Sequence, residues 1–440
     1  MNRKFSRREF MEWTARGTIG LVGTSWLSKA SANFAGELNG KSIVVVVKDE
    51  YVLDQRRKIQ AGIIQKMVDV GIRNLTGINE IGPAWQSLFP DLTPQKTISI
   101  KVNCINHHLS SHPEVAYAIA NGLTQMKIND QYFPAENIII WDRRAYELRA
   151  AGYVINQNDA GVRCYATDSS GIGHSPTKFD IAGKSEYISK IITDKSDYLI
   201  NLSVLKNHWL SGITLSMKNH YGSCGDPGKL HGSNGDPYLP ALTAIAPIRA
   251  KQVLCICDAL LGIISGGPGG APQVMPKSLI FSQDPVAHDF IGAELLKANG
   301  CRTTGSASFL KTASNPPYNL GTNNPDEIIR IDLDTTSSGV QADRDESITD
   351  CRLWQNYPNP FNATTTISYQ LAEPGPVNLR IYDLRGGLVR ELVNTVQPAG
   401  YHQVRWGGLN SNNRPVASGC YLAQLQQDQV RQTIRMQLIK

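Results

Sequence analysis

The chain has 440 residues, enough for two or three domains, and 41% of them are hydrophobic, so each domain can bury a core. The formal net charge of +6 comes mostly from residues 1–32, where six lysines and arginines face two glutamates, which leaves +2 for the remainder. That remainder lacks the basic patch typical of nucleic-acid binding and lacks a segment apolar enough for a transmembrane helix. We therefore expect neither a nucleic-acid partner nor a permanent transmembrane anchor.

The first 32 residues have the pattern of an export signal. The adjacent pair Arg7 and Arg8 is followed by a mildly apolar stretch, Trp13–Leu27, that is too short and too polar to span a bilayer stably. The small residues Ala30–Ala32 suit a cleavage site. The segment resembles a twin-arginine signal, which implies export across the inner membrane, already folded, by the twin-arginine translocase. An ordinary secretory leader is the alternative.

Residues 40–300 alternate short apolar runs with helical patterns. Four runs predict buried strands, at residues 42–47, 137–141, 198–202 and 253–257. Continuous apolar runs are typical of strands covered on both faces, as in a parallel sheet. Helices are expected from Pro113, because proline suits a first helical turn, and from a cap at Asp284 through Leu296. The pattern predicts an α/β domain with crossover helices and a mainly parallel sheet.

The composition changes after residue 300. Residues 301–352 are rich in Thr, Ser, Asn, Pro and Asp, with a strand-like pattern at 328–331, and we interpret them as a domain edge followed by a polar linker. From 353 to 440 the apolar residues alternate with a period of two, at 366–369, 377–382 and 402–406. That alternation predicts a small all-β sandwich.

Five segments in residues 353–440 carry a resemblance to a known module: Asn356–Asn362, Ile381–Gly386, Ala399–His402, Ala417–Tyr421 and Met436–Lys440. They resemble the type A sorting domain of the type IX secretion system, whose fold is an immunoglobulin-like sandwich. The resemblance implies recognition by the type IX machinery at the outer membrane, then release or attachment at the cell surface. The periplasm is the alternative location, and a plain surface-adhesion sandwich is the alternative module.

Polar residues follow the predicted strands of the α/β domain. Asn103 follows residues 97–102, Asp142 follows 137–141, Lys206–His208 follow 198–204, and Asp258 follows 253–257. In an open α/β sheet, ligands bind outside the carboxyl ends of the strands. We therefore expect these residues to converge on one crevice.

The same region resembles a family without a settled reaction. A set of segments is similar to the domain-of-unknown-function family DUF362: His112–Val115, Asp142, 198–208, 212–222, Asp258–Ala259, Gly266–Pro268 and 283–289. Many members of that family carry an iron–sulfur ferredoxin segment beside this domain. This chain has no such run of cysteines, so a resident cluster is the less favoured cofactor.

Two lysines stand out in this region. Lys206 and Lys218 lie beside amide and imidazole groups, and two ammonium groups with such donors suit a carboxylate or a phosphate. A desolvated lysine near a second cation also titrates low and acts as base or nucleophile, so we interpret both as catalytic. The alternative is two solvated surface lysines. The expected substrate-binding residues are Asn103, His208, Asn219 and His220.

Carboxylates offer a second kind of site. Asp142, Asp258 and Asp289, with His288, supply ligands for a divalent metal; the alternative assigns Asp258 to a turn and Asp289 to the start of its helix. A glycine-rich loop at 265–270 lacks the pattern of a nucleotide fingerprint and serves equally well as a flexible lid.

The chain has eight cysteines and no C-x-x-C pair. Cys104 and Cys224 lie nearest the expected crevice and are the redox candidates, and Cys351 and Cys420 flank the last domain and are candidates for a disulfide. The leading hypothesis is an exported, cofactor- or metal-dependent enzyme that acts on a small anionic substrate, with redox chemistry favoured. A non-catalytic surface protein that binds an anion or a metal is the second hypothesis, and an iron–sulfur protein is the third.

Overall fold

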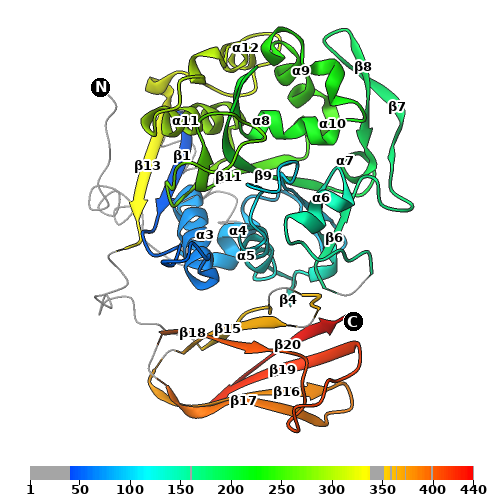
Figure 1. Cartoon of the computed structure of the whole chain (residues 1–440), viewed down its shortest axis with the longest axis vertical. Helices are drawn as coiled ribbons and strands as arrows, with labels where there is room; N and C mark the ends of the chain where they lie inside the picture. Colours follow the sequence, from blue (N-terminus) through cyan, green and yellow to red (C-terminus); the bar gives the residue numbers. More distant parts are fainter. Residues whose placement is uncertain are drawn as a thin grey trace.

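The computed structural model describes residues 40–158, 161–336, 351–356, 359–362, 364–371, 373–397 and 400–439. The expected export signal at 1–32, with Arg7 and Arg8, lies outside the described residues, and so do residues 337–350 of the expected linker. The described part of the chain forms an α/β domain and a separate β sandwich (Figure 1).

A mainly parallel sheet forms the centre of the α/β domain. Its strand order is β13-β1-β12-β11-β9-β2-β5-β6, with β10 paired to β9. Only β12 and β10 run antiparallel to their neighbours. The strands are β1 (Ser42–Lys48), β2 (Ile98–Lys101), β5 (Ile138–Asp142), β6 (Arg163–Ala166), β9 (Tyr198–His208), β10 (Gly212–Thr214), β11 (Gln252–Ile263), β12 (Ser278–Ser282) and β13 (Ile328–Asp334).

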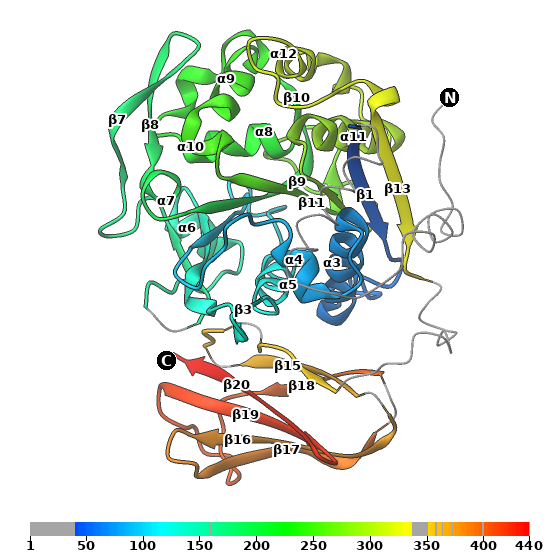
Figure 2. The ribbon, with the colours of Figure 1, turned by 180° about the vertical axis from the view of Figure 1, so that it is seen from behind.

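Helices cover both faces of this sheet (Figures 1 and 2). Alternate residues of β1 enter the two apolar cores: Val45 and Val47 face one layer of helices, whereas Val44 and Val46 face the other. The first layer consists of α3 (Ala61–Thr76), α4 (Ile81–Gln86), α5 (Pro113–Leu123) and α6 (Ala145–Ala150). The second consists of α7 (Lys190–Thr193), α8 (Ser216–Asn219), α9 (Tyr238–Ala244), α10 (Ala246–Arg249), α11 (Pro285–Ala298) and α12 (Phe309–Ser314).

Short elements complete the α/β domain. Two small hairpins lie outside the main sheet, β3 (Lys127–Ile128) with β4 (Gln131–Tyr132), and β7 (His174–Ile181) with β8 (Lys184–Ser189). The single-turn 3₁₀ helices are η1 (Ala135–Asn137), η2 (His220–Ser223), η3 (Pro227–Leu230), η4 (Gly232–Gly235), η5 (Thr304–Ser306) and η6 (Pro325–Glu327). Within the described residues, no helix is both long and apolar enough to cross a bilayer.

Local signals explain where two helices begin. Pro113 occupies the first turn of α5, where its missing N–H costs nothing. Asp284 caps α11, and its Oδ1 accepts hydrogen bonds from the backbone N–H groups of Val286 (2.8 Å) and Ala287 (2.9 Å). Both predicted helix starts are confirmed, as are the four predicted strands of the sheet.

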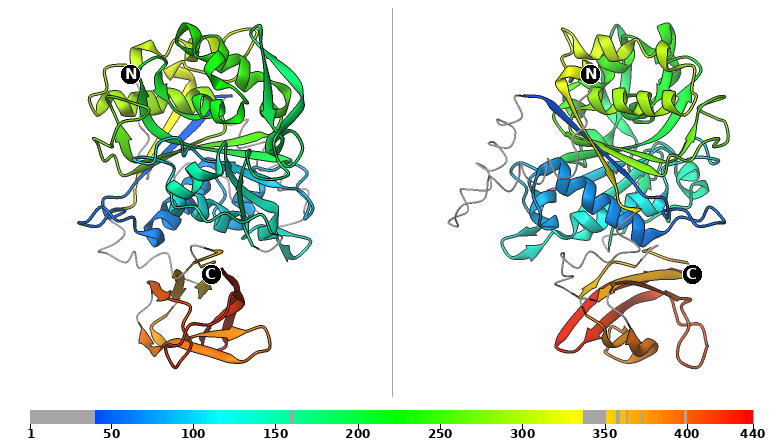
Figure 3. Two further views of the ribbon diagram at one scale, coloured as in Figure 1. Left: turned by 45° about the vertical axis from the view of Figure 1, so that its right-hand side comes forward. Right: turned by 90° about the vertical axis from the view of Figure 1, so that its left-hand side faces the viewer.

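The C-terminal region folds as two packed antiparallel sheets (Figure 3). One sheet contains β14 (Arg352–Leu353), β15 (Thr365–Leu371) and β18 (Gly400–Trp406); the other contains β16 (Gly375–Asp383), β17 (Leu388–Gln397), β19 (Gly419–Gln427) and β20 (Val430–Leu438). Inward residues of both sheets, such as Ile367, Leu379 and Trp406, form one core. The predicted fold class, an α/β domain with a mainly parallel sheet plus a β sandwich, is confirmed.

The disulfide prediction in the sandwich is wrong. Cys351 and Cys420 both carry free thiols. The Cys351 thiol is buried and donates a hydrogen bond to the side-chain oxygen of Gln427, whereas Cys420 contacts the guanidinium of Arg435 at 2.6 Å. Each sulfur therefore has its own neighbour, and the sandwich is held by its apolar core.

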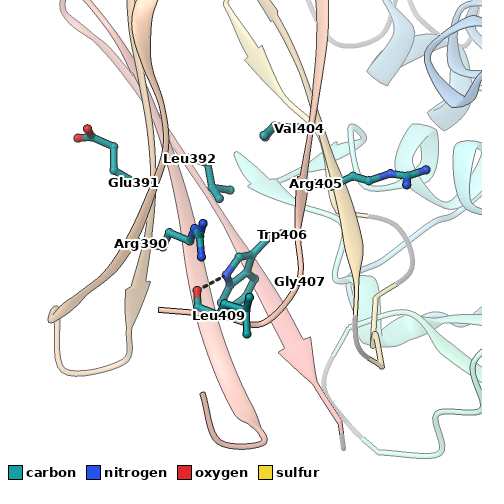
Figure 4. A pocket seen from close by; sticks show the side chains of 8 residues that line it. All are labelled: Arg390, Glu391, Leu392, Val404, Arg405, Trp406, Gly407 and Leu409. Atoms are coloured by element: carbon teal, nitrogen blue, oxygen red, sulfur yellow. Dashed lines mark hydrogen bonds between the residues drawn. The ribbon is translucent and has the colours of Figure 1, made fainter. Parts of the chain in front are cut away.

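A pocket of about 230 Å³ lies in the sandwich, and Figure 4 shows the side chains that line it. Arg390, Trp406 and Leu409 lie on its wall, and the indole N–H of Trp406 donates to the carbonyl of Leu409 (2.9 Å). This pocket belongs to the sandwich and not to the domain that carries the two singled-out lysines.

Candidate functional site

The carboxyl ends of four neighbouring parallel strands bring the predicted polar residues to one edge of the sheet. These strands are β11, β9, β2 and β5. Asn103 follows β2 and Asp142 ends β5, as expected. Lys206 and Asp258 lie inside longer strands than predicted. The hairpin with β10 extends β9 to His208, with Thr214 opposite Lys206, and β11 continues to Ile263.

A buried ion pair at this edge was missed by the sequence analysis. The ammonium of Lys101 contacts Asp142 Oδ1 at 2.6 Å, and the two side chains are 1% and 5% exposed. Lys101 Nζ also donates to the carbonyl of Val102 (2.7 Å) and to Asn219 Oδ1 (3.3 Å). The other carboxylate oxygen of Asp142 accepts the backbone N–H of Cys104 (2.6 Å). The sequence signal that could have indicated this pair is a lysine within a predicted buried strand.

Gly222 allows η2 to approach the ion pair closely. A Cβ at this position would lie 2.7 Å from Lys101 Nζ and 3.0 Å from Asp142 Oδ1. Because real side chains do not tolerate such contacts, any larger residue would displace the pair. Gly222 ends one of the segments that carry the family resemblance.

Lys206 joins the ion pair through two asparagines. Its ammonium donates to Asn103 Oδ1 (2.9 Å), and Asn103 Nδ2 donates to Asn219 Oδ1 (3.2 Å), the oxygen that also accepts from Lys101. Lys206 is fully buried, and this burial lowers its pKa to about 8, although the charges of Asp142 and Asp258 act in the opposite direction. The structure thus brings Lys206, Asn103 and Asn219 together.

His220 lies behind this group and supports it. Asn219 Nδ2 donates to Asn201 Oδ1 (2.8 Å), and Asn201 Nδ2 lies 3.1 Å from His220 Nε2, which is 2.7 Å from Gln252 Oε1. His220 is fully buried, and burial lowers its pKa to about 4, so its ring is neutral at pH 7. This position suits an orienting role for His220 more than direct contact with a ligand.

His112 and Asp258 form a pair that sequence reasoning did not find. His112 Nδ1 lies 2.7 Å from Asp258 Oδ2, which also accepts the backbone N–H of His112 (2.8 Å). The carboxylate is fully buried, whereas the imidazole is 18% exposed. Burial by itself would lower the pKa of His112, but the charge and hydrogen bond of Asp258 outweigh it and raise the pKa. A buried carboxylate thus holds an imidazole at the domain surface.

Lys218 has a different environment from Lys206. Its ammonium lies 3.1 Å from His231 Nε2 and 3.5 Å from the centre of the Tyr221 ring, and the residue is 6% exposed. Burial lowers the pKa of Lys218 to about 7. The alternative of two solvated surface lysines is therefore wrong, since both are buried.

His208 belongs to the surroundings of Lys218. Its Nδ1 accepts the backbone N–H groups of Leu210 (3.1 Å) and Ser211 (3.3 Å), and its ring lies 6.0 Å from that of His231. Burial, followed by the charges of Lys218 and His231, lowers the pKa of His208 to about 3. The imidazole is neutral at pH 7 and its Nδ1 is already occupied.

The three carboxylates proposed as metal ligands have separate partners. Asp142 binds Lys101 and Asp258 binds His112. Asp289 accepts the N–H and hydroxyl of Ser216 (2.8 and 2.6 Å) and the N–H of Met217 (3.0 Å), and it lies 2.9 Å from the ring of its neighbour His288. Asp289 therefore fixes the start of α8. In the described ranges, no three His, Cys, Asp or Glu residues are placed to hold a metal ion together.

The redox-candidate cysteines are poor nucleophiles. Burial raises the pKa of the Cys104 thiol well above its usual value, and the nearby Asp142 adds to this effect. Burial likewise raises the pKa of Cys224. A thiol needs its thiolate form to react or to bind a metal. These two sites consequently favour inert, buried cysteines.

The glycine-rich loop is attached to the domain at both sides. Asn207 Oδ1 accepts the N–H of Gly267 (2.8 Å), and Asn106 Nδ2 donates to the carbonyls of Pro268 and Gly270 (both 2.8 Å). A Cβ at Gly267 would lie 2.2 Å from the carbonyl oxygen of Asn207, so glycine is required there for close approach. The loop thus connects the end of β9 to the segment that precedes α5.

Two segments of the chain match known family models. Residues 98–294 match the domain of unknown function DUF362, and residues 358–429 match the FlgD Ig-like domain. The first match agrees with the resemblance to DUF362 in the sequence segments, and the second indicates an Ig-like domain in the C-terminal region. A search of curated proteins gives no match.

Solved structures that match parts of this chain include the following three. PorZ, a surface component of the type-IX secretion system of Porphyromonas gingivalis, is 22% identical over 21% of this chain and 12% of its own (TM-score 0.16). PorU of the same organism is 21% identical over 20% of this chain and 9% of its own (TM-score 0.18). A Thermotoga maritima protein is 10% identical over 57% of this chain and 59% of its own (TM-score 0.29).

Proposed function

We propose that the α/β domain is an enzyme for a small anionic substrate, bound near Lys206 and Lys218. One observation carries this proposal: each lysine is buried, and its one hydrogen bond within the described residues goes to a neutral group, Asn103 or His231. Burying an ammonium without a carboxylate in contact is costly. A bound carboxylate or phosphate would supply the missing countercharge.

His112 is the proposed acid–base group. Asp258 binds its Nδ1, so Nε2 is the nitrogen left to exchange a proton with a ligand. The carboxylate fixes the ring and stabilises its charged form, the arrangement that general acid–base catalysis requires. The use of a cofactor and of redox chemistry stays a prediction from the sequence. Metal analysis and an absorption spectrum of natively exported protein would test this part.

Anion binding can be measured directly by calorimetry with inorganic phosphate, oxalate and other small carboxylates. Lys206→Met and Lys218→Met should each weaken binding about tenfold to a hundredfold, since a charge-assisted hydrogen bond contributes about 1.5–3 kcal/mol. Lys229→Met is the matched control, because Lys229 is exposed and paired with Glu186. Equal affinities of the wild-type chain and the three variants for these anions would exclude the site. Binding without turnover of any ligand would instead favour the non-catalytic surface protein.

The Ig-like domain is proposed as a type IX sorting signal, which would bring the protein to the cell surface. The support is the set of five sequence segments together with the match to an Ig-like domain. Deletion of residues 353–440 should leave a folded α/β domain in the periplasm of a host with a type IX system. A truncated chain that still reaches the surface would contradict this role.

The leader is proposed to direct the chain to the twin-arginine translocase. Replacing Arg7 and Arg8 together by lysine should then block export across the inner membrane. Cell fractionation that locates the double variant tests this route of export. The comparison is the unaltered chain in a strain that lacks the twin-arginine translocase. Export in that strain would show that an ordinary secretory leader is at work.

A further inference from the structure

The surroundings of Lys218 contain aromatic and imidazole groups. We call His208, Tyr221 and His231 the lysine cage. The ammonium lies over the Tyr221 ring and within hydrogen-bond distance of His231, and the His208 ring lies 6.0 Å from that of His231. Tyr221 and His231 are themselves in edge contact, with ring centres 4.9 Å apart. The cage is thus built from groups that carry no negative charge at pH 7.

Two other buried lysines of the α/β domain have carboxylates close by. Lys101 is in contact with Asp142, and Lys206 feels the charges of both Asp142 and Asp258. For Lys218, burial is the dominant influence on the pKa, and the Cys224 thiol alone opposes it. Between Lys206 and Lys218, Lys218 is therefore the one more readily present as a free amine near pH 7.

His231 is oriented to accept a proton from that amine. Its Nδ1 lies 2.8 Å from the carbonyl of Pro227, so Nδ1 carries the proton and Nε2 presents its lone pair to Lys218. Burial, and then the charge of Lys218, lowers the pKa of His231, which keeps the ring neutral. A nucleophile, a base and a fixed orientation of the base are the parts that covalent catalysis needs.

We propose that Lys218 forms an imine with a small aldehyde or keto acid. In this step the Lys218 nitrogen bonds to the carbonyl carbon, and its proton passes through His231 to the carbonyl oxygen. The resulting hydroxyl group leaves with the second amine proton as water, and the carbon–nitrogen double bond remains. Electrons balance without an oxidant or reductant. The inference rests on the proposed anion site, because it gives that site a carbonyl-bearing carboxylate as substrate.

Reductive trapping tests the imine on the full chain. The protein is treated with glyoxylate and cyanoborohydride at pH 7, and peptide mapping locates the carboxymethyl-lysine that results. Lys229 is the internal control, because it is exposed and carboxylates raise its pKa. The amine fraction of Lys218 should exceed that of Lys229 on the order of a thousandfold, so we expect labelling at least about tenfold faster. Labelling of Lys218 no faster than Lys229 would overturn the inference.

Oxalate separates this inference from the anion site itself, since it offers carboxylates but no reactive carbonyl. Oxalate binding without trapped Lys218 would overturn the imine and leave the anion site standing. Trapped Lys218 with no effect of Lys206→Met on oxalate binding would support the imine and overturn the anion site. Lys218→Arg keeps the positive charge and cannot form an imine. This variant should therefore bind oxalate but give no carboxymethyl-lysine at position 218. A carboxymethyl-lysine that still forms at another lysine of the site would contradict the assignment of the imine to Lys218.

Discussion

Replacing Asp142 by Asn should show how much the ion pair with Lys101 stabilises the α/β domain. The variant keeps the shape of the side chain and leaves the Lys101 ammonium buried at 1% exposure. That ammonium retains two oxygen acceptors, from Val102 and Asn219, but loses its countercharge. The Cys104 N–H can also face an amide donor in place of a carboxylate oxygen. Removing one partner of a buried ion pair lowers the free energy of unfolding by about 3–5 kcal/mol. Because the Lys101 ammonium keeps two acceptors, we expect a loss of about 3 kcal/mol.

Urea unfolding of the full chain measures this loss, with hydrogen exchange of residues 98–142 to separate the α/β domain from the sandwich. Glu50→Gln is the control, because the Glu50 carboxylate is 43% exposed; the change removes its ion pairs with Lys48 (2.5 Å) and Lys277 (2.9 Å) and should cost about 1 kcal/mol or less. Adding Lys101→Met to Asp142→Asn should recover much of the stability. Equal costs for Asp142→Asn and Glu50→Gln would refute the reasoning, since the buried pair would then behave as a solvated one.

Three further outcomes follow from the same structure. Because burial lowers the pKa of Lys218 to about 7, the folded state binds fewer protons than the unfolded chain between about pH 7 and 10.5. The free energy of unfolding of the wild-type chain should therefore rise over that window, as measured by urea titrations at several pH values. A difference in this free energy between wild type and Lys218→Met that stays constant with pH would contradict the prediction. Gly222→Ala should cost about 1–3 kcal/mol by crowding the ion pair, whereas Gly305→Ala, with open space around its Cβ, should cost under about 1 kcal/mol. Asp284→Ala should lower stability by about 2 kcal/mol through the lost helix cap, and an unchanged midpoint would show that the cap contributes nothing.

The fold could be predicted because its signals are local. Four strands of the sheet, β1, β5, β9 and β11, contain short apolar runs, and Pro113 and Asp284 mark helix starts within one turn of the chain. The positions at which the strands end were harder to predict. Whether β9 stops at residue 204 or continues to His208 depends on its pairing with β10, which is a tertiary contact. The lysine at 206 was therefore placed after a strand that in fact contains it.

The site was predicted only in outline for the same reason. The expectation that polar residues meet at the carboxyl edge depends on sheet topology, and the contacts of Lys206, Asn103 and Asn219 agree with it. Pairings between distant residues leave no trace in a single sequence. His112 and Asp258 are 146 positions apart, and nothing near either residue indicates the other.

The charges around the three buried lysines of the α/β domain indicate where selection for function acts. The ammonium of Lys101 is neutralised by contact with Asp142, and that of Lys206 is partly balanced by two carboxylates at longer range. Lys218 has neither kind of compensation. A buried, uncompensated lysine lowers stability, and a methionine of similar length would remove that cost. Its placement against a base, His231, is difficult to explain by folding alone and is what a reactive amine requires.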